Sequence, residues 1–214
     1  MKVLIKARET LQQCLQRNRT ILKATALSFS LIALLSGIMT IAFFSVAPWM
    51  SDWFWSMAES ERRYVAIPPP VTEDLYFFIF LNNIGHFWDP VKMLVWIPLL
   101  GTFILSLELL LNGGIIGIVA VTAGITHGPL YPILGLIPHG IVEIPAFIFL
   151  FTALIRWHVT AAEAVMKKII GEKMEDAKLG RDLKDTVILA VASIALFMIA
   201  AFIETYMTPS LLGM

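Results

Sequence analysis

The sequence predicts an all-α fold: a polytopic membrane bundle with about five transmembrane helices, some broken or re-entrant, together with amphipathic surface helices. Composition is the first reason, because 58% of the 214 residues are hydrophobic and only 15% are charged. The mean hydropathy of +0.79 lies far above that of soluble domains. Apolar runs long enough to cross a bilayer recur, and the charged residues gather in blocks between them. We therefore expect a multi-pass protein of the cell membrane, with the lipid bilayer as its first partner.

The charge balance excludes one class of partner. The 16 basic and 16 acidic residues cancel, so the net charge gives no reason to expect a nucleic acid. Cys14 is the single cysteine, which rules out an intramolecular disulfide and predicts a free thiol in a reducing compartment.

Residues 1–23 predict a cytoplasmic amphipathic helix that lies along the membrane surface. Apolar residues recur there at roughly helical spacing among basic ones: Val3, Leu4, Leu11, Leu15, Ile21 and Leu22. Residues 24–47 form the first span, which ends at Pro48. This span is about twice as long as the apolar region of a cleaved signal peptide, so we expect it to remain as the anchor of a single transmembrane domain, residues 24–214.

Residues 48–75 predict an extracytoplasmic loop, since the tryptophans of "WMSDWFW" are typical of a membrane boundary and "IPPP" at 67–70 is rigid and extended. The chain then stays apolar from Leu75 to Gly124, a length that fits two crossings. Pro90 and the sequence Asn112-Gly113-Gly114 are expected to interrupt this region. Two arrangements remain open: a kinked helix pair, or a short re-entrant helix followed by one long span.

Three further segments complete the predicted bundle. Residues 126–132 form a loop, 133–155 a span, 156–185 a cytoplasmic surface helix and turn, and 186–208 the last span. Basic residues concentrate at the N-terminus and in 156–185, so the positive-inside rule places the N-terminus in the cytoplasm. With five spans, the C-terminus lies outside.

Two ionisable residues stand four positions apart in the apolar run "LIPHGIVEIPA", 136–146. Such groups cost roughly 2.5–3.5 kcal/mol each to insert, so each requires a partner, a water cavity or a function. On a helix that has Pro138 in its first turn, His139 and Glu143 share one face, where they can bond to each other or ligate one cation. Glu204 has a similar expected depth in the last span. These three residues are candidate ligands for zinc or another divalent cation.

Four more polar residues join the candidate ligand-binding or ion-binding set. Asn82 and Asn83 fall in the outer half of the membrane in the expected topology, where a buried amide requires a partner. Glu108 and Asn112 share a helix face at spacing four. The remaining histidines are expected to be solvated near span ends or loops: His86, His127 and His158.

Several kinds of chemistry remain open for these residues. They can form a hydrogen-bonded plug that locks the helices, or they can bind an ion or solute. The sequence lacks HExxH, GxSxG, a Ser-Lys pair and a Gly-rich phosphate loop, so no catalytic residue is assigned. A metal-dependent intramembrane hydrolase that uses a bound water is a lesser alternative.

Four motifs occur in order: "FFIFLNNIG", "LELLLNGGIIG", "LIPHGIVEIPA" and "AAFIETYMTP". In these motifs the sequence resembles the stage II sporulation protein M family of integral membrane proteins, from about residue 75 to the end. The matching positions are Asn82, Asn83, Asn112, Gly113, Gly117, Pro138, His139, Gly140, Glu143, Glu204 and Pro209.

The resemblance implies a role in organising envelope or membrane partners. In spore-forming bacteria such proteins look like scaffolds that hold peptidoglycan-degrading enzymes at the septum, while many relatives belong to organisms, archaea included, that form no spores. We therefore expect a non-enzymatic scaffold or assembly protein, a homodimer or larger homo-oligomer, that organises other membrane or envelope proteins. The alternative is a transporter or ion-binding protein with a His/Glu/Asn site in the outer half of the bilayer.

Overall fold

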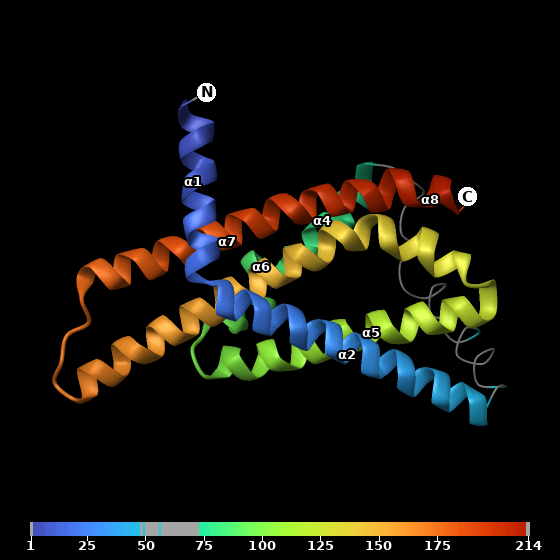
Figure 1. Ribbon diagram of the computed structural model, residues 1–214, viewed down its shortest axis with the longest axis horizontal. Coiled ribbons are helices and arrows are strands. Elements are labelled where there is room, and N and C mark those ends of the chain that lie inside the picture. The colour runs from blue at the N-terminus through green and yellow to red at the C-terminus, as the bar shows by residue number, and fades with distance from the viewer. Residues whose placement is uncertain (1, 48, 50–55, 57–72, 213–214) are drawn as a thin grey trace. The chain divides into compact units, whose positions relative to one another are not determined.

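The computed structural model describes residues 2–47, 49, 56 and 73–212, and these residues form helices and turns without a strand (Figure 1). Most of the predicted loop 48–75 therefore lies outside the described residues. The elements are α1 (Lys2–Arg17), α2 (Arg19–Val46), α4 (Glu73–Asn83), η1 (Gly85–Phe87), η2 (Lys92–Trp96), α5 (Leu100–His127), α6 (Leu130–Ile169), α7 (Asp176–Phe202), η3 (Ile203–Met207) and α8 (Thr208–Leu211).

The predicted all-α membrane bundle is confirmed. Four helices in the described part of the chain are long and apolar enough to cross a bilayer: Arg19–Val46, Leu100–His127, Leu130–Ile169 and Asp176–Leu211. The region from Leu75 to Gly124 contributes one of them. It also contributes α4, whose 11 residues extend only about 16 Å along the helix axis. In this region a short helix, α4, and two short turns, η1 and η2, precede the long helix α5.

Several predicted boundaries were wrong. The surface helix expected over 1–23 ends at Arg17, because the buried Asn18 turns its amide back to the Cys14 carbonyl, 2.9 Å away, and α2 starts at the next residue. The helix α5 continues through Asn112-Gly113-Gly114, where an interruption was expected. Pro138 lies well inside α6, which begins at Leu130, rather than in a first turn.

The chain divides into two compact units, each built from three stretches of sequence. Unit 1 contains Met1–Ser28, Ile84–Glu108 and Ile144–Phe197. Unit 2 contains Phe29–Asn83, Leu109–Glu143 and Met198–Met214. The long helices α2, α5, α6 and α7 each contribute residues to both.

Side chains bonded to backbone carbonyls tie η1 and η2 to α6 in unit 1. Trp157 Nε1 donates to the Trp96 carbonyl at 2.6 Å, and His158 Nε2 contacts the Val95 carbonyl at 2.8 Å. Trp96 Nε1 in turn donates to the His86 carbonyl at 2.8 Å. Carbonyls in such short turns lack a regular helical partner, so these donors satisfy groups whose burial would otherwise be costly.

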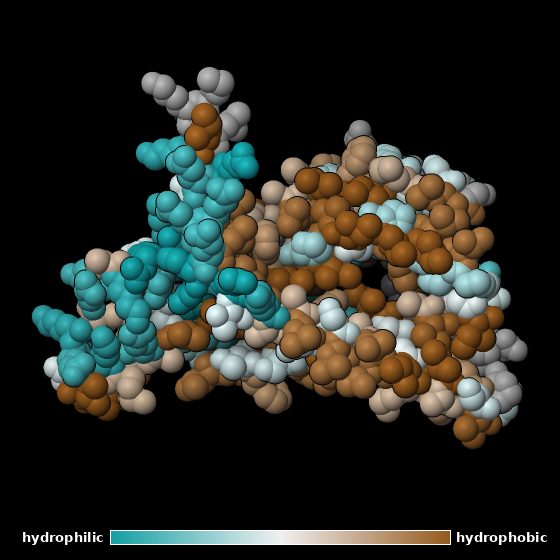
Figure 2. Space-filling model, viewed as in Figure 1, coloured by the Kyte–Doolittle hydropathy of each residue, from teal (hydrophilic) through white to brown (hydrophobic). Residues whose placement is uncertain are grey.

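The rest of unit 1 packs α1 against α6 and α7. Their shared apolar core comprises Cys14, Ala153, Leu189 and Ala190. Phe147 of α6 meets Phe197 of α7 edge to face, with ring centroids 4.9 Å apart. Hydrophilic side chains gather on α1 and around the connection between α6 and α7 (Figure 2).

Small residues let α2 and α5 approach closely in unit 2. A Cβ atom on Gly117 would collide with the Ala33 carbonyl and the Ser36 hydroxyl. A Cβ atom on Gly113 would lie 3.1 Å from Cγ2 of Ile32. Glycine is thus required where the helix backbones nearly touch, as is common between membrane helices. In the same unit α4 packs against η3.

Candidate functional site

Unit 2 contains a cluster of one imidazole and two carboxylates. His139 and Glu143 lie one turn apart on α6, with His139 Nε2 3.9 Å from Glu143 Oε2. Glu204 comes from η3, far along the chain. The three residues, hereafter the His-Glu-Glu cluster, each offer one ligand atom, and these atoms all lie within 4.8 Å of one another. Each side chain is partly buried.

The backbone around the His-Glu-Glu cluster is irregular on both sides. Pro138 and Pro145 lie within α6, where a proline removes a hydrogen bond to the preceding turn. Glu204 lies in η3, a single π-helical turn of Ile203–Met207 that interrupts the α-helix. Such π turns are rare overall, but those that occur are often found at functional sites, because the extra residue changes the direction of the side chains.

Two polar side chains from other elements contact the cluster. Asn83, at the end of α4, donates from Nδ2 to Glu143 Oε1 at 3.1 Å. The Thr208 hydroxyl of α8 lies 3.5 Å from His139 Nδ1, at the limit of a hydrogen bond. The second contact leaves His139 Nε2 facing Glu143. Such contacts orient ligand side chains in many metal sites.

Among the described residues of unit 2, no lysine or arginine balances the charges of the cluster. In the described part of the chain, every lysine and arginine belongs to unit 1. His139 is therefore the basic side chain that the described structure places beside Glu143 and Glu204. Two carboxylates this close, away from bulk water, favour a bound cation or a bound proton.

The other sequence candidates are not among the three ligand residues of the cluster. Asn82 is exposed, unlike its neighbour Asn83, and Asn112 is half-buried within α5. Glu108 belongs to unit 1, where its Oε2 pairs with His86 Nε2 at 2.8 Å.

The expectation that the remaining histidines are solvated was wrong for two of them. His86 and His158 are buried. His158 Nδ1 lies 3.0 Å from the Thr102 hydroxyl while its Nε2 contacts a backbone carbonyl, so both ring nitrogens have partners. His127, at the end of α5, is exposed as expected. The two buried rings fasten turns to helices, a role that spacing along the chain does not reveal.

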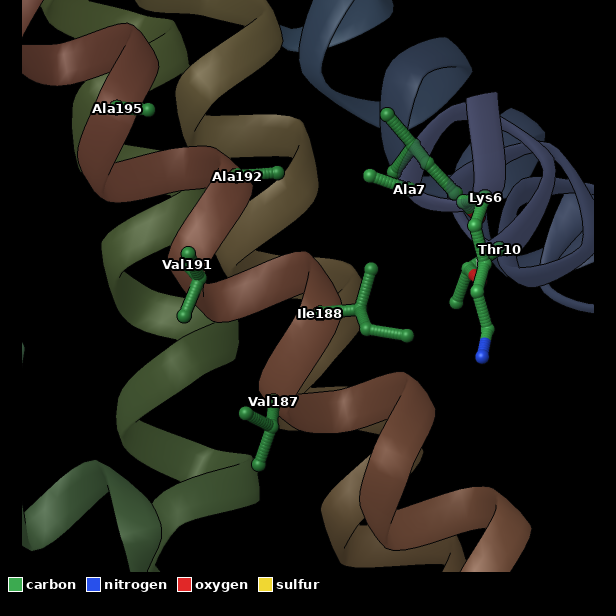
Figure 3. Close-up of a pocket in the computed structure, with 9 residues that line it drawn as sticks. Lys6, Ala7, Thr10, Val187, Ile188, Val191, Ala192 and Ala195 are labelled. Carbon is green, nitrogen blue, oxygen red and sulfur yellow. The ribbon is translucent and has the colours of Figure 1, made fainter. Parts of the chain in front are cut away.

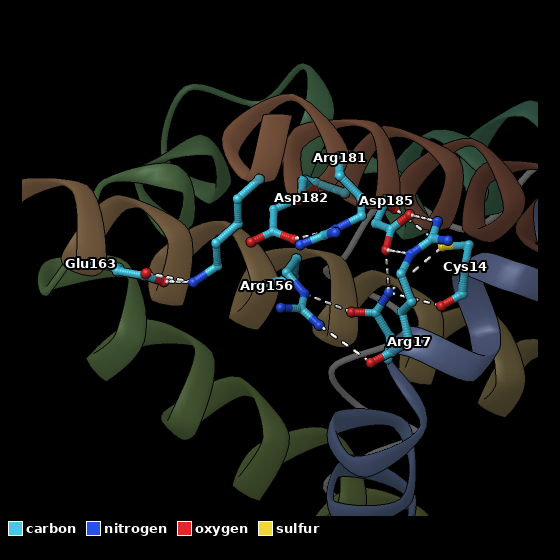
Figure 4. Close-up of polar contacts among 10 residues, drawn as sticks. Cys14, Arg17, Arg156, Glu163, Arg181, Asp182 and Asp185 are labelled. Atoms are coloured by element: carbon cyan, nitrogen blue, oxygen red, sulfur yellow. Dashed lines mark hydrogen bonds and ion pairs between the residues drawn. The ribbon is translucent and has the colours of Figure 1, made fainter. Parts of the chain in front are cut away.

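A second polar network, in unit 1, was missed by sequence reasoning (Figure 4). Arg17 grips Asp185 with two bonds, Nε to Oδ2 at 2.8 Å and Nη2 to Oδ1 at 2.5 Å. Asn18 Nδ2 donates to Asp185 Oδ2 at 3.0 Å, and Arg156 Nε donates to Asn18 Oδ1 at 2.7 Å. These residues flank the predicted spans, so they looked like ordinary solvated ends. One signal was available in the sequence. Arg17 and Asp185 both lie just outside predicted spans, at the same expected depth, where a guanidinium and a carboxylate can pair.

Cys14 is a buried free thiol beside this network. Burial raises the pKa of Cys14 from 9.0 to about 11, and the neighbouring carboxylate of Asp185 adds to the increase. The thiol is therefore protonated and unreactive at neutral pH. Its contacts indicate a packing role.

An open groove of about 580 Å³ runs between α1 and α7 in unit 1 (Figure 3). Its walls are almost entirely apolar, formed on α7 by Val187, Ile188, Val191, Ala192 and Ala195. The Lys6 ammonium and the Thr10 hydroxyl belong to the α1 side. A groove with this lining suits a hydrocarbon chain and lacks the ligands that an ion or polar solute requires.

These features define a class: a polytopic helical membrane protein with a carboxylate–imidazole cluster in one unit and a structural ion pair in the other. The chain belongs to the stage II sporulation protein M family, whose model matches residues 26–209. It is also similar to an uncharacterised protein of Methanocaldococcus jannaschii, with 37% identity over 115 residues. That match covers 52% of this chain and 59% of the relative. No solved structure matches the chain.

Proposed function

We propose that the protein is an integral membrane scaffold that organises other membrane or envelope proteins, as the family resemblance implies. The observation that carries the proposal is α1, a charged helix that is fixed to the membrane helices by the Arg17–Asp185 pair. A helix held in this way presents its polar face in a defined orientation, which a docking surface requires.

The position and surface of α1 support this role. It precedes the residues matched by the family model, 26–209. Its exposed polar side chains include Lys6, Arg8, Glu9, Gln12, Gln13 and Gln16. Charged residues of both signs on a fixed helix suit a protein partner through complementary charges.

We further propose that the N-terminus is cytoplasmic and the C-terminus outside. The described lysines and arginines belong to unit 1, which contains the N-terminus. Five crossings would consist of the four long apolar helices and, as a broken second crossing, the segment formed by α4, η1 and η2.

Site-specific photo-crosslinking in native membranes tests the scaffold proposal. A photoreactive amino acid at Gln12, which is exposed on α1, should give a discrete adduct with a second copy of the chain or with one defined partner. The matched control is Leu34, an exposed apolar residue of α2, which should give only diffuse adducts with lipid.

The variant Arg17→Ala should reduce the Gln12 adduct, because α1 loses its main fastening to α7. The proposal fails if Gln12 and Leu34 give the same adducts, or if Gln12 gives none in folded protein.

A further inference from the structure

We propose that the His-Glu-Glu cluster binds a divalent transition-metal ion, for which zinc is the best match. This proposal goes beyond the scaffold role and does not depend on it. His139 Nε2 and one oxygen each of Glu143 and Glu204 would be the ligand atoms.

The distances require only a small closure around an ion. Zinc lies about 2.0–2.2 Å from nitrogen and oxygen ligands, so ligand atoms around one tetrahedral ion are roughly 3.3–3.6 Å apart. The pair His139 Nε2 and Glu143 Oε2, at 3.9 Å, is already close to this separation. The three candidate ligand atoms all lie within 4.8 Å of one another, so shifts of up to about 1.5 Å in the flexible glutamate side chains bring them to this separation.

The hydrogen bonds leave the ligand atoms available. His139 uses Nδ1 toward the Thr208 hydroxyl, so Nε2 is free to face an ion. Asn83 donates to Oε1 of Glu143, while the other oxygen, Oε2, faces His139. Contacts from the far side of a ligand raise its basicity and fix its orientation.

The charge distribution supplies an independent reason. Two carboxylates at membrane depth are costly unless they are compensated, and the lysines and arginines of the described residues belong to unit 1. A divalent cation would neutralise both carboxylates at once. The π-helical turn that carries Glu204 is a second, conformational reason, because a regular α-helix would place this carboxylate differently.

The mixed donor set identifies the class of ion. Calcium and magnesium prefer sites made wholly of oxygen atoms, whereas an imidazole with carboxylates suits zinc and its neighbours. Three protein ligands leave a fourth position for water or for a group from another molecule.

Metal content of the purified full-length protein is the first test. Protein loaded with zinc and then dialysed should retain about one ion per chain, as measured by inductively coupled plasma mass spectrometry. Glu204→Gln and His139→Gln should each reduce the retained zinc by at least tenfold. The matched control is Glu108→Gln, which alters the other His–Glu pair of the protein and should leave the zinc content unchanged.

Cobalt(II) substitution in the wild-type protein is the second test, and it does not require that any variant fold. A tetrahedral site with nitrogen and oxygen ligands should give visible d–d absorption that zinc removes by competition. Folded wild-type protein that retains no zinc and gives no such spectrum would refute the proposal, as would an equal loss of zinc in Glu108→Gln and Glu204→Gln. The crosslinking at Gln12 reports on the scaffold role separately.

Discussion

Asp185 in unit 1 and Glu143 in unit 2 are both carboxylates on long apolar helices, and the protein satisfies them in different ways. Asp185 accepts two bonds from the Arg17 guanidinium and a third from Asn18. Glu143 accepts one bond from the neutral amide of Asn83 and lies near a second carboxylate, Glu204. Asp185 is therefore bonded to a cationic side chain, whereas the hydrogen-bond donor to Glu143 is a neutral amide.

The two units also differ in how their helices are joined. Unit 1 uses side-chain donors such as Trp157 and His158, which satisfy the backbone of η2. Unit 2 uses close backbone contact at Gly117 between α2 and α5. Charged networks are expensive to leave incomplete, and glycine contacts are sensitive to added volume. The stability of unit 1 should therefore depend most on complete polar networks, and that of unit 2 on the small volume of its glycines.

The largest effect is expected from Asp185→Ala. Removal of this buried carboxylate leaves the Arg17 guanidinium without its partner, which should lower the free energy of unfolding by about 3 kcal/mol. Denaturant or thermal unfolding in detergent measures the change. Arg181→Ala is the control, since Arg181 is exposed and should alter stability little. Equal effects of the two substitutions would show that the network does not fasten α1.

Labelling of Cys14 tests the same network through its chemistry. With a pKa of about 11, Cys14 should react with a maleimide at pH 8 about 100-fold more slowly than an exposed thiol. The control thiol is Gln12→Cys in a Cys14→Ser background, on the exposed side of α1.

The sign of the pH dependence follows from the same shift. Above about pH 9 the unfolded chain releases the Cys14 proton while the folded protein keeps it, so this residue should lower stability as the pH rises toward 11. Cys14→Ser should lack this loss. Fast labelling of Cys14 in the folded protein would indicate that α1 separates readily from α7.

Gly117→Ala should weaken unit 2. The added methyl group meets the Ala33 carbonyl, so the substitution should reduce the free energy of unfolding by about 1–3 kcal/mol. Gly114→Ala, in the same helix, is the control, because a Cβ atom there meets nothing within 4 Å. This control should be neutral or stabilising by up to about 1 kcal/mol. A loss in the control as large as in Gly117→Ala would mean that α5 rather than its contact with α2 is affected.

The smallest effect is expected from Glu143→Gln in protein freed of divalent ions. The glutamine oxygen can still accept from Asn83, and the repulsion from Glu204 disappears, so the free energy of unfolding should change by less than about 1 kcal/mol. Asp185→Asn, the equivalent change in unit 1, should cost more. A large loss in Glu143→Gln would show that the glutamate charge has a counter-charge within the protein.

The sequence was sufficient for some parts of the candidate site and insufficient for others. His139 and Glu143 share a face because helical spacing sets it, and Glu204 was selected because a charge in an apolar run is costly. The separation of Asn83 from Asn82 was not predictable, since it depends on how α4 meets α6. The pairing of Glu108 with His86 was not predictable either, because His86 lies in a short turn whose path the apolar pattern does not determine.

By itself the sequence determined that the chain is an all-helical membrane protein. Long apolar runs are more stable in a bilayer than in water, and within a bilayer a helix satisfies the backbone hydrogen bonds. It also determined which charges are costly. Only the tertiary structure decided which of them have partners: Arg17 with Asp185, His86 with Glu108, and Glu204 beside His139 and Glu143. The reason is that such pairs form between helices far apart along the chain, where local spacing carries no information and packing alone selects the neighbour.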